Sequence, residues 1–374
     1  MENYTFFCPN PNCTNHNTES GNKDWYIKKG YHQTNAFGKI QRYICKSCNR
    51  GFSDQTFSLN YYLKIKTDFR KMFDQFNSSN SDCFTARHFD MSFDSLQIRR
   101  HRLARNALFF QSKVLEGISI HESLCTAGLK TYTKNKFYPV NINILIGRET
   151  RFLYYFTESH QRRKGCMTEA QKNRTHEEYR DKSFSDSALH VQFKKIIDFI
   201  CDKSDTGKIY LYTDEHKTYK LIIDKWNLNA DIITPYIEHH QTNSKAPRTK
   251  DNPAASANYI DMLTRKDQPN HRRKTICKTG NDRNMLSRMA CYMLSHNFFK
   301  PKKILSRRNQ VRERHYHGTG INEKSVQSMK EIIFTNRMVI SKVSLPGFFG
   351  EIWFKKTATP LLSRPDYLPK FAAA

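Results

Sequence analysis

The central part of the chain, residues 117–240, alternates between apolar runs with strand-like spacing and apolar runs with helix-like spacing. Three apolar-rich runs come first, GISIHESLCTA, FYPVNINILIG and TRFLYYFTE, and the polar turns GLKTYTKNK and RE separate them, which predicts an antiparallel meander of three strands. The segments that follow are predicted, in order, as a helix (188–203), a strand (207–216), a helix (217–226) and a strand (230–240).

This order of elements, βββαβαβ followed by a further helix, is that of the RNase H-like fold. We therefore predict an α/β domain of this fold over residues 113–300, with the basic, polar segment at about 160–185 as an exposed insertion. The fold class is α+β multidomain. Residues 301–374 are predicted to be a C-terminal extension, basic at its start and aromatic later, to which the sequence assigns no function.

Residues 59–112 are predicted to form a helix-turn-helix DNA-binding domain. Helical spacing occurs in KTDFRKMFDQF, CFTARHFDM and FDSLQIRRHRLARNALFF, with polar breaks between the helices and a Ser/Asp start before the third. The third helix would hold arginines near phosphates and present polar residues of its first turns to base edges. The candidate DNA-binding residues of this helix are Asp94, Ser95, Gln97, Arg99, Arg100, Arg102 and Arg105. The alternative is a charged, solvated face on an ordinary helical bundle.

The first 58 residues contain two pairs of closely spaced cysteines. The pairs are Cys8 with Cys13 and Cys45 with Cys48, and short alternating runs joined by the polar turn QTNAFGK lie between them. Two such pairs can bring four thiolates to one tetrahedral site, so we predict a zinc ribbon with these cysteines as ligands of a structural Zn²⁺ ion. Four unrelated buried cysteines, or a redox pair, are the weaker alternatives.

The charge of the chain indicates a polyanionic partner. The 374 residues contain 62 Lys and Arg against 35 Asp and Glu, a formal net charge of +27, and the excess is spread along the whole length. No apolar run approaches the roughly 18 residues that a membrane-spanning helix needs, and no basic-then-apolar leader opens the sequence. We expect a cytoplasmic protein in a reducing compartment and no membrane partner.

Two aspartates occupy positions suited to a metal ligand. Asp214 ends the predicted strand GKIYLYTDEH, where a side chain escapes burial, and Asp261 lies among apolar neighbours on a helix in NYIDMLTRKD. Two-metal phosphoryl transfer needs oxygen ligands that are distant in sequence and convergent in space. The alternatives are a helix N-cap for Asp214 and an ion pair with Arg265, four residues along the helix, for Asp261.

The blocks TAGLKTYTKNKFYPVNIN, SHQRRKGCMTEAQKNR, YTDEHKTY and NYIDMLTRKDQPNHRRKTICK follow one another behind the predicted ribbon and helix-turn-helix. In content and order they resemble a DDE-type insertion-sequence transposase, of the group that includes the smallest bacterial insertion sequences. The resemblance covers nearly the whole chain. It implies that the second acid of the catalytic set is Asp214 and that the third is Asp261, where glutamate is commoner.

The resemblance also implies an Asp-Gly pair where this sequence has Ala127-Gly128. We interpret Ala127 as a replacement of the first acid, and favour an engineered substitution, because it would remove a metal ligand while leaving strand packing nearly intact. A naturally inactive copy is one alternative. Another is that the ligand lies upstream, at Glu122 or His121.

The implied activity is DNA cleavage and strand transfer at the terminal inverted repeats of a mobile element, with Mg²⁺ or Mn²⁺ as catalytic cofactor. The implied partners are double-stranded DNA, both element ends and target, and a second copy of the chain in a homodimer or larger assembly, in the bacterial nucleoid. Further candidate phosphate-binding residues are Arg162, Arg163, Lys164, Arg272, Arg273 and Lys274. Solvated surface charge is the alternative for each. The rival function is a non-catalytic, sequence-specific DNA-binding regulator on a degenerate transposase scaffold.

Overall fold

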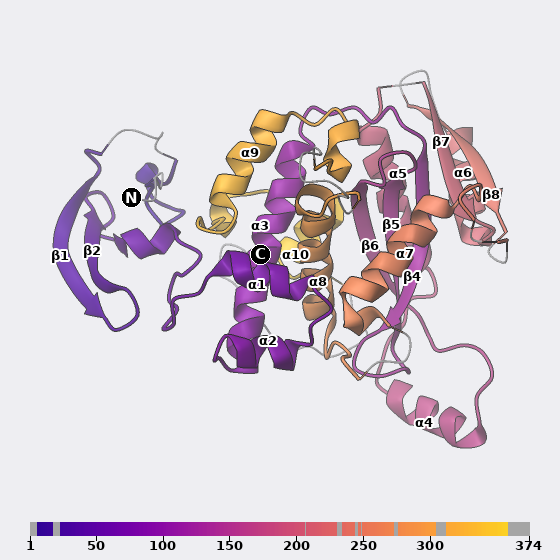
Figure 1. Cartoon of the computed structure of the whole chain (residues 1–374), viewed down its shortest axis with the longest axis horizontal. Helices are drawn as coiled ribbons and strands as arrows, with labels where there is room; N and C mark the ends of the chain where they lie inside the picture. The colour runs from indigo at the N-terminus through magenta and orange to yellow at the C-terminus, as the bar shows by residue number, and fades with distance from the viewer. Residues whose placement is uncertain are drawn as a thin grey trace.

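The computed structural model describes residues 6–17, 23–205, 207–229, 234–243, 246–247, 249–272, 276–303 and 312–357. These residues form helices and two β-sheets, which confirms the predicted α+β class. Figure 1 shows the small N-terminal sheet at one end of the molecule, the larger sheet toward the other end, and long helices between them. No helix in the described part of the chain combines the length and the apolar character needed to cross a bilayer.

The N-terminal unit is a three-stranded antiparallel sheet of order β1-β2-β3 with a core of its own. A tight turn joins the first two strands, and Gly38, the first residue of β2 after that turn, has a φ of +66°, a backbone conformation that glycine adopts without strain. The core consists of aromatic rings packed around the cysteines, with Trp25 stacked on Phe52. The strands are β1 (Tyr26–Thr34), β2 (Gly38–Cys45) and β3 (Gly51–Ser53).

Three helices follow, close to the predicted positions. Each begins where a short polar side chain accepts a hydrogen bond from the backbone of the first turn: Asp68, Ser81 and Ser92 are the N-caps. The third helix is far longer than the others and lies against a later helix, α8, along much of its length. The helices are α1 (Phe69–Phe76), α2 (Asp82–His88), α3 (Phe93–Val114) and α8 (Asp282–Leu294).

The larger sheet has five strands in the order β6-β5-β4-β7-β8. The three strands β4, β5 and β6 form an antiparallel meander, and β7 and β8 add in parallel to the open side of β4. The strands are β4 (Leu124–Tyr132), β5 (Pro139–Gly147), β6 (Leu153–His160), β7 (Lys208–Asp214) and β8 (Tyr236–Thr242).

Helices cover both faces of this sheet. On one face, Tyr155 of β6 stacks on Phe199 of α5, and α6 follows β7 on the way to β8. On the other face, α7 packs on β4 and β5. A fourth helix, α4, lies in the predicted insertion and contributes no buried residue, and Figure 1 shows it projecting from the body. These helices are α4 (Glu169–Tyr179), α5 (Ala188–Asp202), α6 (Lys217–Leu228) and α7 (Ala255–Asp267).

The first strand of the meander was predicted at residues 117–127 and is found at Leu124–Tyr132, so the predicted turn GLKTY is strand. Gly128 explains the error, because glycine favours a turn in sequence but is required here by packing. A Cβ atom on Gly128 would lie 2.3 Å from Oδ1 of Asn141 on the neighbouring strand.

The buried core does not divide at the predicted boundaries 112 and 300. One hydrophobic cluster runs from Leu59 to Trp353, and it joins α3, the five-stranded sheet and the C-terminal helices. Asn106 of α3 donates to the carbonyl oxygens of Ile333 and Asn336, 2.7 and 2.8 Å away. The predicted helix-turn-helix domain and C-terminal extension are therefore parts of one body, completed by α9 (Glu323–Ile332) and α10 (Gly347–Trp353). The short helices are η1 (Thr14–His16), η2 (Asp54–Phe57), η3 (Pro269–His271), η4 (Ser295–Phe299), η5 (His315–Gly318) and η6 (Ile340–Lys342).

Candidate functional site

The four N-terminal cysteines meet in one cluster that could hold a metal ion. Their sulfur atoms all lie within 4.8 Å of one another; the Sγ atoms of Cys8 and Cys48 are 3.4 Å apart, and those of Cys13 and Cys45 are 3.7 Å apart. Four sulfurs at about 2.3 Å from a tetrahedral ion would be separated by about 3.8 Å. The cluster therefore has the size of a four-thiolate site.

The surroundings of the cysteine cluster favour a thiolate at Cys45. Burial acts to raise the pKa of Cys45, but hydrogen bonds from the Asn15 side chain and from the backbone of Cys48 and Ser47 outweigh it and lower the pKa to about 6. The Asn15 amide nitrogen lies 3.5 Å from the Cys45 sulfur and 2.7 Å from the Ser47 hydroxyl. A donor held in this way orients a metal ligand from outside the ligand set.

A second site lies where the parallel strands of the five-stranded sheet end. Residue Ala127 of β4, Asp214 at the end of β7 and Asp261 of α7 all line one cavity of about 170 Å³. Leu124 and Cys125 pair with Leu211 and Tyr212, and residue 127 and Asp214 each follow two positions after the last of these pairs. The cavity is the place where three predicted positions, remote in sequence, come together.

Asp214 is not the N-cap of the following helix. The N-cap of α6 is His216, and Asp214 accepts a hydrogen bond from the His216 backbone N–H at 3.1 Å through Oδ1. Its carboxylate lines the cavity and makes no ion pair among the described residues. The cap interpretation of Asp214 is therefore wrong, and Asp214 is one of the residues that line the cavity.

Asp261 forms the ion pair that was its alternative interpretation. Nε of Arg265 lies 3.1 Å from both carboxylate oxygens, and Nη2 lies 3.0 Å from Oδ1. The same guanidinium donates to the carbonyl oxygens of His271 and Lys130 at 2.6 and 3.1 Å, so its position is fixed from three sides. The charge of Asp261 is thus balanced inside the cavity by a well-held cation.

The two upstream alternatives for the first ligand lie elsewhere. Glu122 accepts from the backbone N–H of Thr150 at 3.0 Å, from the Thr150 hydroxyl at 2.6 Å and from the Tyr154 hydroxyl at 2.7 Å, which makes it a structural cap of the β5–β6 turn. His121 is exposed and lies 3.6 Å from Asp205. Neither Glu122 nor His121 lines the cavity, so both alternative predictions for the first ligand are wrong. Of the three positions, only residue 127 lines it.

Two of the arginines predicted to contact DNA are buried. Arg99 is 2% exposed and donates to Thr67 at 2.6 Å, while Arg100 is 0% exposed and forms a two-pronged ion pair with Asp82. Arg288 of α8 binds the same carboxylate. The prediction that Arg99 and Arg100 face phosphates is therefore wrong, because their guanidinium groups hold the interior of the helical layer together.

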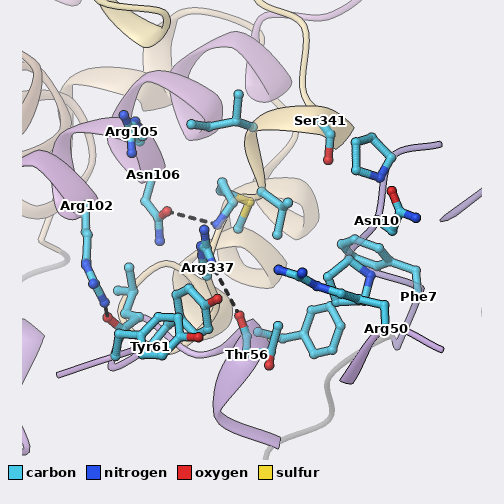
Figure 2. A pocket seen from close by; sticks show the side chains of 18 of the residues that line it. Phe7, Asn10, Arg50, Thr56, Tyr61, Arg102, Arg105, Asn106, Arg337 and Ser341 are labelled. Carbon is cyan, nitrogen blue, oxygen red and sulfur yellow. Dashed lines mark hydrogen bonds between the residues drawn. The ribbon is translucent and has the colours of Figure 1, made fainter. Parts of the chain in front are cut away.

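Arg102 and Arg105 lie on the side of α3 that borders a large groove between the N-terminal sheet and the helical layer. The groove has a volume of about 1000 Å³, and Arg50 and Arg337 also line it, as Figure 2 shows. Burial and the neighbouring cations Arg337, Arg99 and Arg105 lower the pKa of Arg102 to about 10. No aspartate or glutamate is among the described residues that line the groove, so positive charge gathers there.

Two of the groove arginines are held in place by their own contacts. Arg337 lies over the ring of Tyr61 at 4.1 Å from the centroid and donates to the Thr56 carbonyl oxygen at 3.4 Å, while Arg102 donates to the Leu59 carbonyl oxygen at 2.5 Å (Figure 2). Oriented guanidinium groups beside aromatic rings are suited to phosphates and exposed bases. Sequence reasoning missed Arg50 and Arg337, since neither stands in a motif.

The other predicted DNA-contacting residues that the structure describes are exposed or half-buried, and none of them lines the groove. Asp94 is exposed in the first turn of α3, and Ser95 and Gln97 are half-buried beside it. Arg162 and Lys164 are exposed in the insertion, whereas Arg163 packs on Phe137 and donates to Gln171 at 3.0 Å. Arg272 is exposed near the acidic cavity and donates to the Arg265 carbonyl oxygen at 3.0 Å. Arg273 and Lys274 lie outside the described residues.

No family model matches the chain, and neither a curated protein nor a solved structure matches it.

Proposed function

We propose that the chain is a DDE-type insertion-sequence transposase in which the first catalytic acid is replaced by Ala127. The observation that carries the proposal is the shared cavity: residue 127, Asp214 and Asp261 line it together although they are far apart in sequence. A hydrolytic metal site for phosphoryl transfer needs such convergence of oxygen ligands. Ala127 contributes a methyl group where the reaction needs a carboxylate.

The topology supports an RNase H-like catalytic domain. The strand order β6-β5-β4-β7-β8, with three antiparallel strands followed by two parallel ones, agrees with the βββαβαβ succession predicted from the apolar runs of the sequence. The candidate acids lie at the carboxyl ends of the parallel strands and on the helix beside them, which is where open α/β sheets bind their ligands. The helix α7 that carries Asp261 packs directly on β4.

The donor set of the cavity suits Mg²⁺ or Mn²⁺ only in part. It offers the carboxylates of Asp214 and Asp261, and Arg265 already neutralises the second. A pair of divalent ions needs more negative charge than this. We infer that the chain as written does not cleave DNA, and that an acid at residue 127 would supply the missing ligand and a charge that competes with Arg265.

We propose Zn²⁺ as the ion of the cysteine cluster, because the sulfur separations match tetrahedral thiolate coordination and zinc is the usual occupant of such sites. The proposed role is structural. The ribbon core is built around the cysteines, with few apolar side chains besides its aromatic rings, so an ion would add much of the stability of this unit.

The proposed partner is double-stranded DNA bound along the basic groove. A net charge of +27 and a groove lined by Arg50, Arg102, Arg105 and Arg337 without a carboxylate both favour a polyanion. The recognition surface would then lie between the ribbon and α3, not on the first turns of α3. A homodimer or larger assembly, in which two element ends are joined, belongs to the same proposal.

The test is to restore the acid. Ala127→Asp is expected to give Mg²⁺-dependent nicking of a DNA duplex that carries the ends of the element, and the chain as written is expected to give none. Ala127→Asn is the matched control, because it has the same shape without the charge and should stay inactive.

The rival function, a DNA-binding regulator on a degenerate scaffold, predicts a different outcome. DNA binding with no cleavage by Ala127→Asp, in either Mg²⁺ or Mn²⁺, would favour the regulator. Loss of DNA binding on changing Arg105 and Arg337 to glutamine is expected under both functions and does not separate them.

A further inference from the structure

A third group of polar side chains lies inside the protein, apart from the cysteine cluster and the acidic cavity. It consists of Glu158 and His160 on the edge strand β6 and Asp282, the first residue of α8. The strand pairing puts Glu158 level with Ile142, and His160 level with Val140, while Asp282 comes from the N-terminus of α8. The group therefore stands between the edge of the sheet and the start of a core helix.

The three side chains converge closely in the buried part of the protein. One ligand atom from each residue can be chosen such that all lie within 4.8 Å of one another, and Nε2 of His160 is 3.4 Å from Oδ1 of Asp282. Glu158 is 2% exposed, His160 7% and Asp282 3%.

Two of these side chains lack the partners that burial requires. Both carboxylate oxygens of Glu158 and both ring nitrogens of His160 are buried without a hydrogen-bond partner. Leaving a buried polar group unsatisfied costs about 1–3 kcal/mol, and more for a charged group. Burial, followed by the nearby charges of Asp282 and Glu351, raises the pKa of Glu158 well above its usual range.

We propose that Glu158, His160 and Asp282 bind a divalent transition-metal ion of the zinc or manganese type. One imidazole nitrogen with two carboxylates is a ligand set that such ions accept, whereas a purely oxygen set would favour Mg²⁺ or Ca²⁺. Metal–ligand distances of about 2.0–2.2 Å require donor atoms within about 4.4 Å of one another. The observed 4.8 Å limit meets this after small side-chain shifts.

Charge balance supports the same assignment. Two carboxylates and a neutral imidazole carry two negative charges, which a divalent cation cancels, so the filled site is neutral in the interior. The ion would also give Glu158 and His160 the partners that they lack.

The position of the site indicates what the ion would do. His160 is the last residue of β6, and the insertion that carries α4 leaves the sheet directly after it. An ion that joins His160 to the first turn of α8 would clamp the edge of the sheet to the helical layer. The site would therefore be structural, and its occupancy does not depend on the chemistry proposed for the acidic cavity.

The test begins with the metal content of the full chain, purified from medium supplemented with Zn²⁺ and Mn²⁺ and dialysed. The Cys45→Ser variant, which lacks a complete cysteine cluster, is expected to retain about one equivalent of metal per chain. The double variant Cys45→Ser/Glu158→Gln is expected to lose it. Absence of bound metal from folded Cys45→Ser would overturn the proposal, and so would metal that persists unchanged in the double variant.

Thermal unfolding supplies the second measurement. Glu158→Gln alone is expected to lower the unfolding temperature and to abolish any increase caused by added Zn²⁺ or Mn²⁺. If no metal binds, replacing Glu158 with the uncharged glutamine would remove the cost of burying an unpartnered carboxyl group. The variant would then unfold at the same or a higher temperature, and this result would contradict the proposal. Glu351→Gln is the matched control, because it removes a nearby charge but no ligand, and it should keep the ion.

Discussion

Replacing Asp82 with asparagine removes the carboxylate that joins three helices of the interior. Asp82 lies in the first turn of α2 and binds Arg100 of α3 and Arg288 of α8 at the same time; one Arg100–Asp82 contact measures 3.0 Å. Both guanidinium groups are buried. The asparagine would keep the shape of the side chain but would leave two cations without their counter-charge.

The expected loss is large for a single polar substitution. Breaking a buried ion pair by removing one partner costs about 3–5 kcal/mol, because the remaining charge is left uncompensated. Here the two remaining cations also repel each other, and burial together with Arg100 already lowers the pKa of Arg288 to about 10. With a urea m value of about 3 kcal/mol/M, the unfolding midpoint of Asp82→Asn should fall by about 1–1.7 M.

The measurement is urea unfolding followed by far-UV circular dichroism, which reports on the helices. Asp94→Asn is the matched control, because Asp94 also lies in the first turn of a helix but is exposed. Loss of the negative charge of Asp94 should lower the free energy of unfolding by at most about 1 kcal/mol, through the helix dipole. Equal midpoints for the two variants would refute the buried network and would return Arg100 to the set of possible DNA contacts.

The contribution of Asp82 to stability should also depend on pH. Burial acts to raise the pKa of Asp82, but Arg100 and Arg288 outweigh it, and the pKa is lowered. A carboxyl group with a lowered pKa contributes stability above its unfolded pKa of about 3.9, and this contribution is lost as the pH falls through the folded value. The difference in unfolding free energy between the unchanged chain and Asp82→Asn should therefore be full at neutral pH and should narrow below about pH 4.

Two further substitutions test the ribbon and the sheet. Cys45→Ser should release the metal of the cysteine cluster and abolish binding to the element ends, measured by metal analysis and gel shift; the exposed Cys83→Ser is the control, and unchanged binding would remove the ribbon from recognition. Gly128→Ala should cost about 1–3 kcal/mol in urea unfolding, because its Cβ would displace the buried Asn141 side chain. Gly280→Ala, which meets nothing within 4 Å, should be nearly neutral, and an equal cost for both would contradict the packing argument.

Local patterns in the sequence predicted much of the fold because the physics they depend on is local. The helix start at Ser92 follows from a hydroxyl that accepts a hydrogen bond from the first turn, and the strand ending at Asp214 follows from an apolar run that stops at an acid. The order of the elements then limited the number of possible sheet topologies. Asp214 and Asp261, which were predicted as site residues, both line the cavity.

The errors arose where a residue's role depends on a distant partner. Arg100 has the spacing of a solvated basic face, but its partner Asp82 lies on another helix, 18 residues away. Arg288, which binds the same carboxylate, comes from a third helix, so no pattern along one helix contains this network. The same holds for the groove, since Arg50 and Arg337 come from opposite ends of the chain. Residues that satisfy one another across a core cannot be identified from periodicity alone.

The pair formed by Asp261 and Arg265 connects these points to the proposed chemistry. With Ala at position 127, the cavity contains two carboxylates, and one ion pair makes Asp261 electrostatically satisfied without a metal. A carboxylate at residue 127 would add a negative charge to the cavity that Asp214 lines, and that charge would favour a divalent cation over the guanidinium at Asp261. One substitution in a strand would then decide whether Arg265 or a metal ion neutralises Asp261, while the sheet itself stays unchanged.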